Sequence, residues 1–161
     1  MFWYLEMQLN NVKLTILMFL LIVCQLAINN LTIIYVDCLG VLLAILLAYN
    51  SFSIRAIILL SIISDLIGHW YIGSHLFASV LVSVVTGYCT NFYKMSNFLQ
   101  RYILVAIFYV IFKGILILLD KLLGNSVSIA YSYPVEIGII LPVTFIIFSR
   151  YIIRPSSDII V

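Results

Sequence analysis

The chain has 161 residues, of which 65% are hydrophobic and only 9% carry a charged side chain. A soluble domain carries roughly 25% charged residues, and a soluble fold of this length could not enclose so much apolar surface. The composition therefore predicts that lipid is the solvent for most of the chain. The formal net charge of +2 is too small to indicate binding to nucleic acid.

A helix that crosses a bilayer needs about 20 apolar residues, and about 17 to 25 are tolerated. The chain contains six such stretches, joined by brief connections, and the third is short. We therefore predict an all-α, polytopic integral membrane protein with a single helical domain over residues 1–161. The six transmembrane helices are expected at about 12–28, 31–49, 54–67, 74–93, 101–119 and 135–153.

The distribution of lysine and arginine predicts the orientation of these spans, because cytoplasmic flanks carry the excess of positive charge. With the N-terminus inside, only Lys121 would lie on the outer side, and Lys113 lies within a span. Both termini are therefore expected in the cytoplasm. The residues on the cytoplasmic side would be Lys13, Arg55, Lys94, Arg101, Arg150 and Arg154.

The segment SIISDLIGHWYIGSHLF, residues 61–77, contains one carboxylate and two histidines. His69 and His75 are six residues apart, which is not the i, i+4 spacing of a helical zinc pair, and no cysteine or second carboxylate lies nearby in the sequence. The interpretation we favour is that both histidines are polar residues of an outer turn at the level of the lipid headgroups. A metal site is the alternative.

Three ionisable residues fall within the predicted spans, namely Asp37, Asp65 and Lys113. Charged groups at membrane depth are costly and usually face other helices, where they find a partner. All three lie in the outer half of the predicted bilayer, so they are expected to form an intramembrane charge network. The sequence leaves open whether Lys113 pairs with Asp37 or Asp65, or extends toward the headgroups instead.

Small residues recur at four-residue spacing on two predicted helices. Such a stripe allows another helix backbone to approach closely, which is how helices associate in lipid. These positions are therefore candidates for helix packing or for a partner interface. They are Gly40, Ala44 and Ala48 on the second span, and Ser79, Ser83 and Gly87 on the fourth.

A reaction centre needs a nucleophile, a base or a metal cluster converging on one place. The polar residues within the spans are few and scattered, and Cys24, Cys38 and Cys89 lie in apolar runs without CxxC spacing. We therefore expect no catalytic residues, no cofactor and no bound metal.

The order of features resembles that of the rod shape-determining protein MreD family. The resemblance covers about residues 31–95. It is carried by a second span reading TIIYVDCLGVLLAILLAY, a third span ending in SIISDLIG, and a following turn with WYIGSH. Residues 64–68 and 72–76 look like the family's Asp-Leu and glycine-turn motif, with residues 69–71 as a bulky insert.

This resemblance implies a non-catalytic scaffold subunit of the bacterial cell-elongation machinery in the inner membrane. Its expected partners are an MreC-like bitopic membrane protein, an MreB-like filament, and RodA-like and transpeptidase-like peptidoglycan synthases; a homodimer stays open. The alternative function is a substrate-binding subunit of a small-molecule transporter, similar to the S component of energy-coupling-factor transporters. That family uses small residues on its first helix, whereas LTILMFLLIVCQL contains neither glycine nor alanine.

Overall fold

The structure is a computed structural model, and it describes residues 2–31, 35–49, 54–68, 71–93, 98–124 and 133–152. The described residues form helices joined by turns and short extended segments, with no strand among them. The helices are α1 (Phe2–Leu31), α2 (Cys38–Tyr49), α3 (Ile54–Gly68), α4 (Ser74–Tyr93), α5 (Phe98–Leu122), and a final run of α6 (Tyr133–Val135), η2 (Glu136–Ile140), α7 (Leu141–Ile147) and η3 (Phe148–Ile152).

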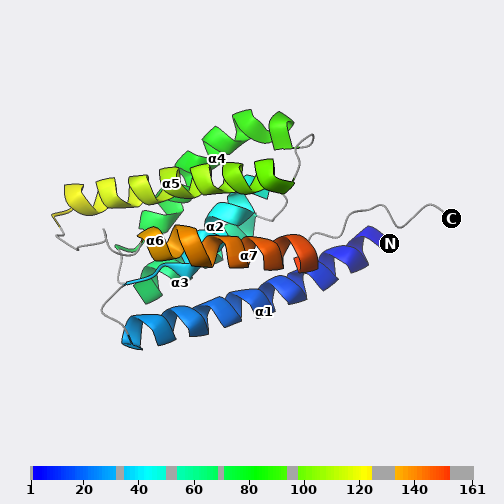
Figure 1. The fold of residues 1–161 in the computed structure, drawn as a ribbon, viewed down its shortest axis with the longest axis horizontal. Helices are drawn as coiled ribbons and strands as arrows, with labels where there is room; N and C mark the ends of the chain where they lie inside the picture. The colour runs from blue at the N-terminus through cyan, green and yellow to red at the C-terminus, as the bar shows by residue number, and fades with distance from the viewer. Residues whose placement is uncertain are drawn as a thin grey trace.

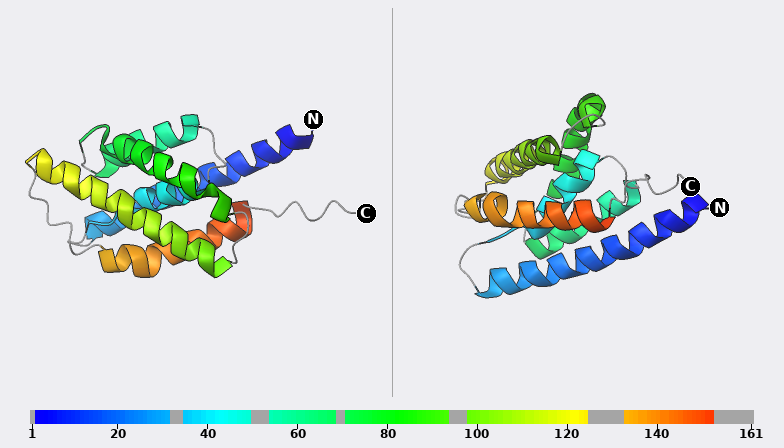
Figure 2. Two further views of the ribbon diagram at one scale, coloured as in Figure 1. Left: turned by 90° about the horizontal axis from the view of Figure 1, so that it is seen from above. Right: turned by 45° about the vertical axis from the view of Figure 1, so that its right-hand side comes forward.

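The helix α2 lies in the middle of the bundle. It packs against α1, α3, α4, α5 and α7, and every residue from Val36 to Ala48 is buried. Helices α1 and α4 lie on opposite sides of it, and the start of α1 and the end of η3 lie toward the same end of the bundle (Figures 1 and 2). A central helix with apolar residues on all sides is the arrangement expected when no face meets solvent or lipid.

The predicted second span, residues 31–49, is not one helix. Tyr35, Val36 and Asp37 are non-helical, and α2 begins only at Cys38. The physical reason is Asp37, whose side chain bonds to the backbone of the next turn and so favours the first position of a helix over its interior. At 12 residues, α2 is about 18 Å long, which is shorter than the hydrocarbon core of about 30 Å.

The final helical run contains two π-helical segments, η2 and η3. The backbone N–H of Leu141 donates to the carbonyl of Glu136, five residues earlier, and Pro142 has no N–H with which to restore the usual pattern. Such bulges are often found at functional sites. Here the bulge begins at Glu136, a fully buried carboxylate.

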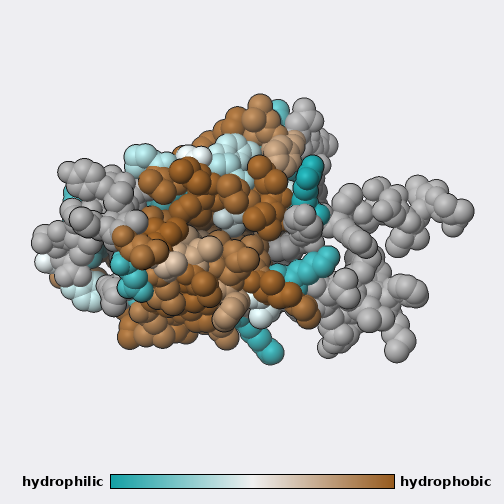
Figure 3. Space-filling view, turned by 60° about the horizontal axis from the view of Figure 1, so that its bottom comes forward, coloured by the Kyte–Doolittle hydropathy of each residue, from teal (hydrophilic) through white to brown (hydrophobic). Residues whose placement is uncertain are grey.

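The outer surface of the bundle is strongly apolar. Hydrophobic side chains cover most of the middle of one face, and polar groups lie toward its two ends (Figure 3). Two helical stretches, Val12–Leu31 and Phe98–Leu122, are long and apolar enough to cross a membrane, and Cys38–Ala48 and Ser74–Thr86 are shorter apolar helices.

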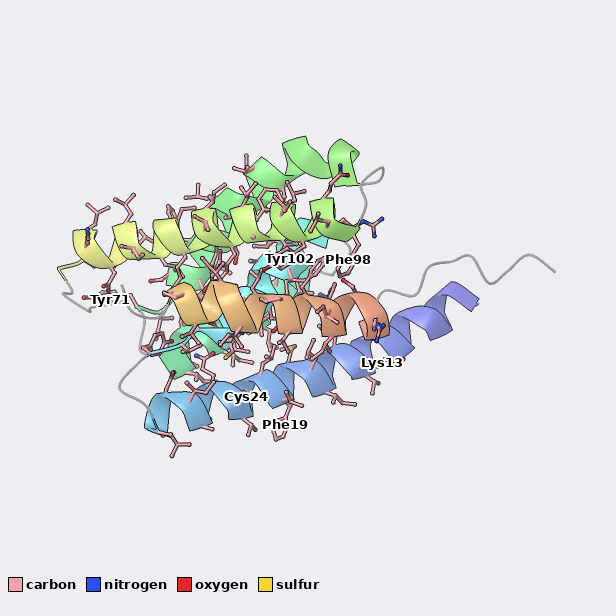
Figure 4. All side chains as sticks on the ribbon, viewed as in Figure 1. Lys13, Phe19, Cys24, Tyr71, Phe98 and Tyr102 are labelled. Atoms are coloured by element: carbon pink, nitrogen blue, oxygen red, sulfur yellow. The ribbon has the colours of Figure 1, made fainter. Side chains whose placement is uncertain are left out.

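Figure 4 places Phe19 on the outer side of α1, and Cys24 on the same helix is also exposed. It also shows Lys13 toward the end of the bundle where η3 ends, and Tyr71 at the opposite end. Lys94, Arg154 and His69, which entered the sequence predictions, lie outside the described residues.

Candidate functional site

Asp37 caps the N-terminus of α2 inside the bundle. Its Oδ1 accepts the backbone N–H of Gly40 at 2.8 Å, and its carbonyl accepts the N–H of Val41 at 3.2 Å. Its side chain is completely buried. The carboxylate folds over Gly40, where a Cβ would overlap it. A glycine at position 40 therefore leaves the room that the capping carboxylate of Asp37 needs.

The extended segment before α2 is held by polar side chains of α1. Asn29 brackets Val36: its Oδ1 accepts the Val36 N–H at 2.8 Å, and its Nδ2 donates to the Val36 carbonyl at 3.3 Å. Gln25 Oε1 accepts the N–H of Leu39 at 3.1 Å. Buried backbone groups outside a helix need partners; Asn29 supplies them at Val36, and Gln25 accepts an N–H of the first turn of α2.

Asp65, from α3, caps the N-terminus of α4. Its Oδ2 accepts the N–H of Gly73 at 2.7 Å, and its Oδ1 accepts the N–H of His75 at 3.0 Å. Gly73 has φ of 99°, a conformation that favours glycine over residues with a side chain. The turn between α3 and α4 therefore closes onto a carboxylate that is itself buried.

His75 connects the two capping aspartates. Its Nδ1 lies 2.6 Å from Asp65 Oδ1, and its Nε2 lies 3.0 Å from Asp37 Oδ2. The side chain is fully buried, and its ring lies 5.6 Å from the ring of Phe112. The expectation that His75 lies in a turn at headgroup level is therefore wrong, because the residue belongs to the first turn of α4 and faces inward.

Lys113 and Glu136 complete the group. Lys113 Nζ donates to Glu136 Oε1 at 3.1 Å and lies 3.4 Å from Asp37 Oδ2. Glu136 Oε1 also accepts the backbone N–H of Asp37 at 2.9 Å, and its Oε2 accepts the hydroxyl of Tyr109 at 2.5 Å. We refer to Asp37, Asp65, His75, Lys113 and Glu136 as the ion cluster.

The charges of the ion cluster nearly cancel only if it holds one proton beyond that of Lys113. Three ionised carboxylates and Lys113 sum to −2, and an extra proton brings the sum to −1. The N-termini of α2 and α4 point at the cluster, and each contributes about +0.5 charge. The arrangement is then close to neutral, which a site removed from water requires.

The ion cluster contains buried charged groups that pair with one another and connect helices of the bundle. Each of the two aspartates caps a helix, and in the described part of the chain no buried side-chain nitrogen or oxygen is left without a hydrogen-bond partner. Among the same residues, no group of three or more His, Cys, Asp and Glu side chains is arranged to hold a metal ion. Because His69 lies outside the described residues, the metal site that would pair it with His75 stays a prediction.

The structure joins the three residues of the predicted charge network through a residue not included in it. Lys113 lies against Asp37, and His75 connects Asp37 to Asp65. The prediction also omitted Glu136, which stands one residue inside the sixth predicted span and has the same signal of a carboxylate in an apolar run. Gln25 and Tyr109 gave no distinctive signal, because neither residue type is unusual in a membrane helix.

The small-residue stripe of α2 faces other helices of the same chain. Gly40, Ala44 and Ala48 are buried at the centre of the bundle, so a direct role in binding another protein is not available to them. On α4, Ser79 is buried and its hydroxyl lies 3.3 Å from that of Ser61, whereas Ser83 is exposed and bonds to the carbonyl of Val80. The surroundings of Gly87 lie outside the described side chains.

Comparison of the chain with protein-family models gave no match, and comparisons with curated proteins and with solved structures gave none either.

Proposed function

We propose that this protein is a non-catalytic, multi-pass subunit of the bacterial inner membrane that organises cell-wall synthesis in the cell-elongation machinery. In this proposal six spans cross the membrane with both termini in the cytoplasm. The observation that carries it concerns the residues that resemble the MreD family. Asp65, Gly73 and His75, which stand in the resembling motif, form one interlocked cap at the start of α4.

The ion cluster supports a scaffold because its polar groups are already engaged. Asp37, Asp65 and Glu136 accept hydrogen bonds from backbone and side-chain donors within the chain. A catalytic group needs a free face toward a substrate, and these carboxylates are turned inward. The exposed surface available to partners is apolar, as expected of a protein that associates with other membrane helices.

The direct test is copurification from membranes. The full-length chain carrying an affinity tag should retain an MreC-like bitopic protein from the same organism, and depletion of the chain should turn rod-shaped cells round. The control is the Gly114→Ala variant, whose added Cβ meets no atom within 4 Å and which should keep both properties. Retention of no such partner, together with unchanged cell shape after depletion, would reject the scaffold.

A transporter subunit is the second candidate, and the interruption before α2 favours it. Transporters place broken helices at membrane depth so that the N-terminus of the half-helix points at an ion or substrate. Here the N-terminus of α2 points at Asp37 and the ion cluster. Retention of an energy-coupling-factor transducing subunit, and vitamin uptake that depends on this chain, would favour the transporter over the scaffold.

A further inference from the structure

The extra proton of the ion cluster lies at or beside His75. Both ring nitrogens of His75 face carboxylate oxygens, at 2.6 and 3.0 Å. A neutral imidazole has one N–H donor and one lone pair, so in that form one nitrogen would face a carboxylate without a proton between them. One proton must therefore reside either on His75 or on one of the two aspartates.

Both aspartates are surrounded by hydrogen-bond donors. Asp65 accepts two backbone N–H groups at the start of α4, and Asp37 accepts one at the start of α2 and lies near Lys113. Backbone donors, helix N-termini and a neighbouring ammonium all stabilise a carboxylate. The proton is therefore best accommodated on the imidazole.

We propose that His75 is an imidazolium. Its extra proton acts as an internal ligand that holds the N-terminus of α2 against the turn between α3 and α4, and loss of this proton opens the junction. This inference does not depend on the scaffold function. The titratable groups around His75 are Asp65 from α3, Asp37 ahead of α2, and, beyond Asp37, Lys113 and Tyr109 from α5 and Glu136 from η2.

Loss of the proton would leave a lone pair against a carboxylate and an additional uncompensated negative charge. Breaking a buried ion pair from one side is strongly destabilising because the remaining charge stays buried. Cys38 follows Asp37 directly and is only 1% exposed in the closed bundle, so opening of this junction would expose its thiol. Chemical modification of the Cys38 thiol therefore reports on the opening of this junction.

Nitrogen NMR of histidine tests the protonation state without altering the cluster. The chain has two histidines, so a His69→Gln variant labelled with ¹⁵N-histidine and purified in detergent reports on His75 alone. We expect both ring nitrogens to be protonated at about pH 8, where a histidine in water is mostly neutral. A neutral tautomer at that pH would overturn the proposal, since it would place the proton on an aspartate.

The same sample tests whether the proton stabilises the fold. The midpoint of thermal unfolding should fall over the pH range in which the spectra show loss of the second ring proton, and the His69→Gln, His75→Gln double variant should lack this step. An unfolding midpoint that does not respond to the loss of the His75 proton would refute the internal-ligand role.

Thiol labelling at one fixed pH tests the opening. In a chain with Cys24→Ser and Cys89→Ser, Cys38 is the remaining thiol, and His75→Gln should speed its modification by a small maleimide more than about tenfold. Adding Asp37→Asn, which removes one negative charge beside the lost positive one, should slow modification again. The control is Ser83→Ala, on the exposed side of α4, the helix that carries His75. Equal rates in His75→Gln and the control would show that His75 does not hold the junction closed.

Discussion

The ring of His75 lies between two aspartates that cap different helices, with Nε2 3.0 Å from Asp37 and Nδ1 2.6 Å from Asp65. The three residues come from the start of α4, the segment before α2 and the end of α3. One side chain therefore fixes the starting points of two helices relative to each other. Changes at the ion cluster should consequently alter the fold of the bundle and not only a local site.

Gly40→Ala should destabilise the bundle although alanine is the better helix former. The added Cβ would overlap the carboxylate of Asp37, which its partners hold in place. We expect a loss of about 1 to 3 kcal/mol in the free energy of unfolding, measured as a lower midpoint of thermal unfolding in detergent.

The control for this change is Gly114→Ala on α5, where a Cβ meets no atom within 4 Å. It should be neutral or raise stability slightly. Equal behaviour of the two variants would show that Asp37 moves aside without cost.

Gln25→Leu should destabilise the start of α2. The substitution removes the acceptor of the Leu39 N–H and leaves a buried donor without a partner, which costs about 1 to 3 kcal/mol. Leu26→Ala, at the next residue and on the exposed side of α1, is the matched control and should have a smaller effect in the same unfolding assay. The role of Gln25 is disproved if Leu26→Ala is the more damaging change.

Lys113 should couple energetically to Glu136 more strongly than to Asp65. Lys113→Met and Glu136→Gln each break the 3.1 Å pair from one side, so the double variant should be less damaged than the sum of the single changes, by about 1 kcal/mol or more. A double-mutant cycle on protein stability measures this difference. A larger coupling in the cycle that pairs Lys113→Met with Asp65→Asn would contradict the observed geometry.

Tyr109→Phe should lower stability because Glu136 loses a hydrogen bond from the tyrosine hydroxyl. A hydrogen bond to a charged group contributes about 1.5 to 3 kcal/mol. Tyr102→Phe is the control: Tyr102 lies about one turn after the start of α5 (Figure 4), and its ring contact with Phe145, at 5.6 Å, is retained. The two variants should differ clearly in unfolding midpoint, and similar losses would remove the argument for the Glu136 bond.

The proposed topology predicts which cysteines react on intact cells. A cysteine placed at Ile72 or Leu123, both exposed beside turns at one end of the bundle, should be modified by a membrane-impermeant thiol reagent. A cysteine at Phe98, exposed at the opposite end of α5, should react only after the cells are opened. The opposite pattern would invert the orientation.

The sequence by itself determined that the chain is helical and where most of its helices lie. Apolar stretches of helical length, separated by glycine and polar residues, predicted the third and fourth helices at 54–67 and 74–93, and the structure has them at Ile54–Gly68 and Ser74–Tyr93. These boundaries depend on local composition and local hydrogen bonding, which are read directly along the chain. The first helix extends further than predicted because its polar N-terminal part also continues as helix.

Only the tertiary structure decided the interruption before α2 and the membership of the ion cluster. Hydropathy treats the stretch from residue 31 to 49 as one span, because the average over a long window hides a single aspartate. Asp37 begins a helix there because Asn29 and Glu136 bond to the non-helical backbone before α2, and Gln25 accepts an N–H of its first turn. His75 is a charge partner because folding brings together residues 38 positions apart in the sequence, and such a long-range contact leaves no trace in local periodicity.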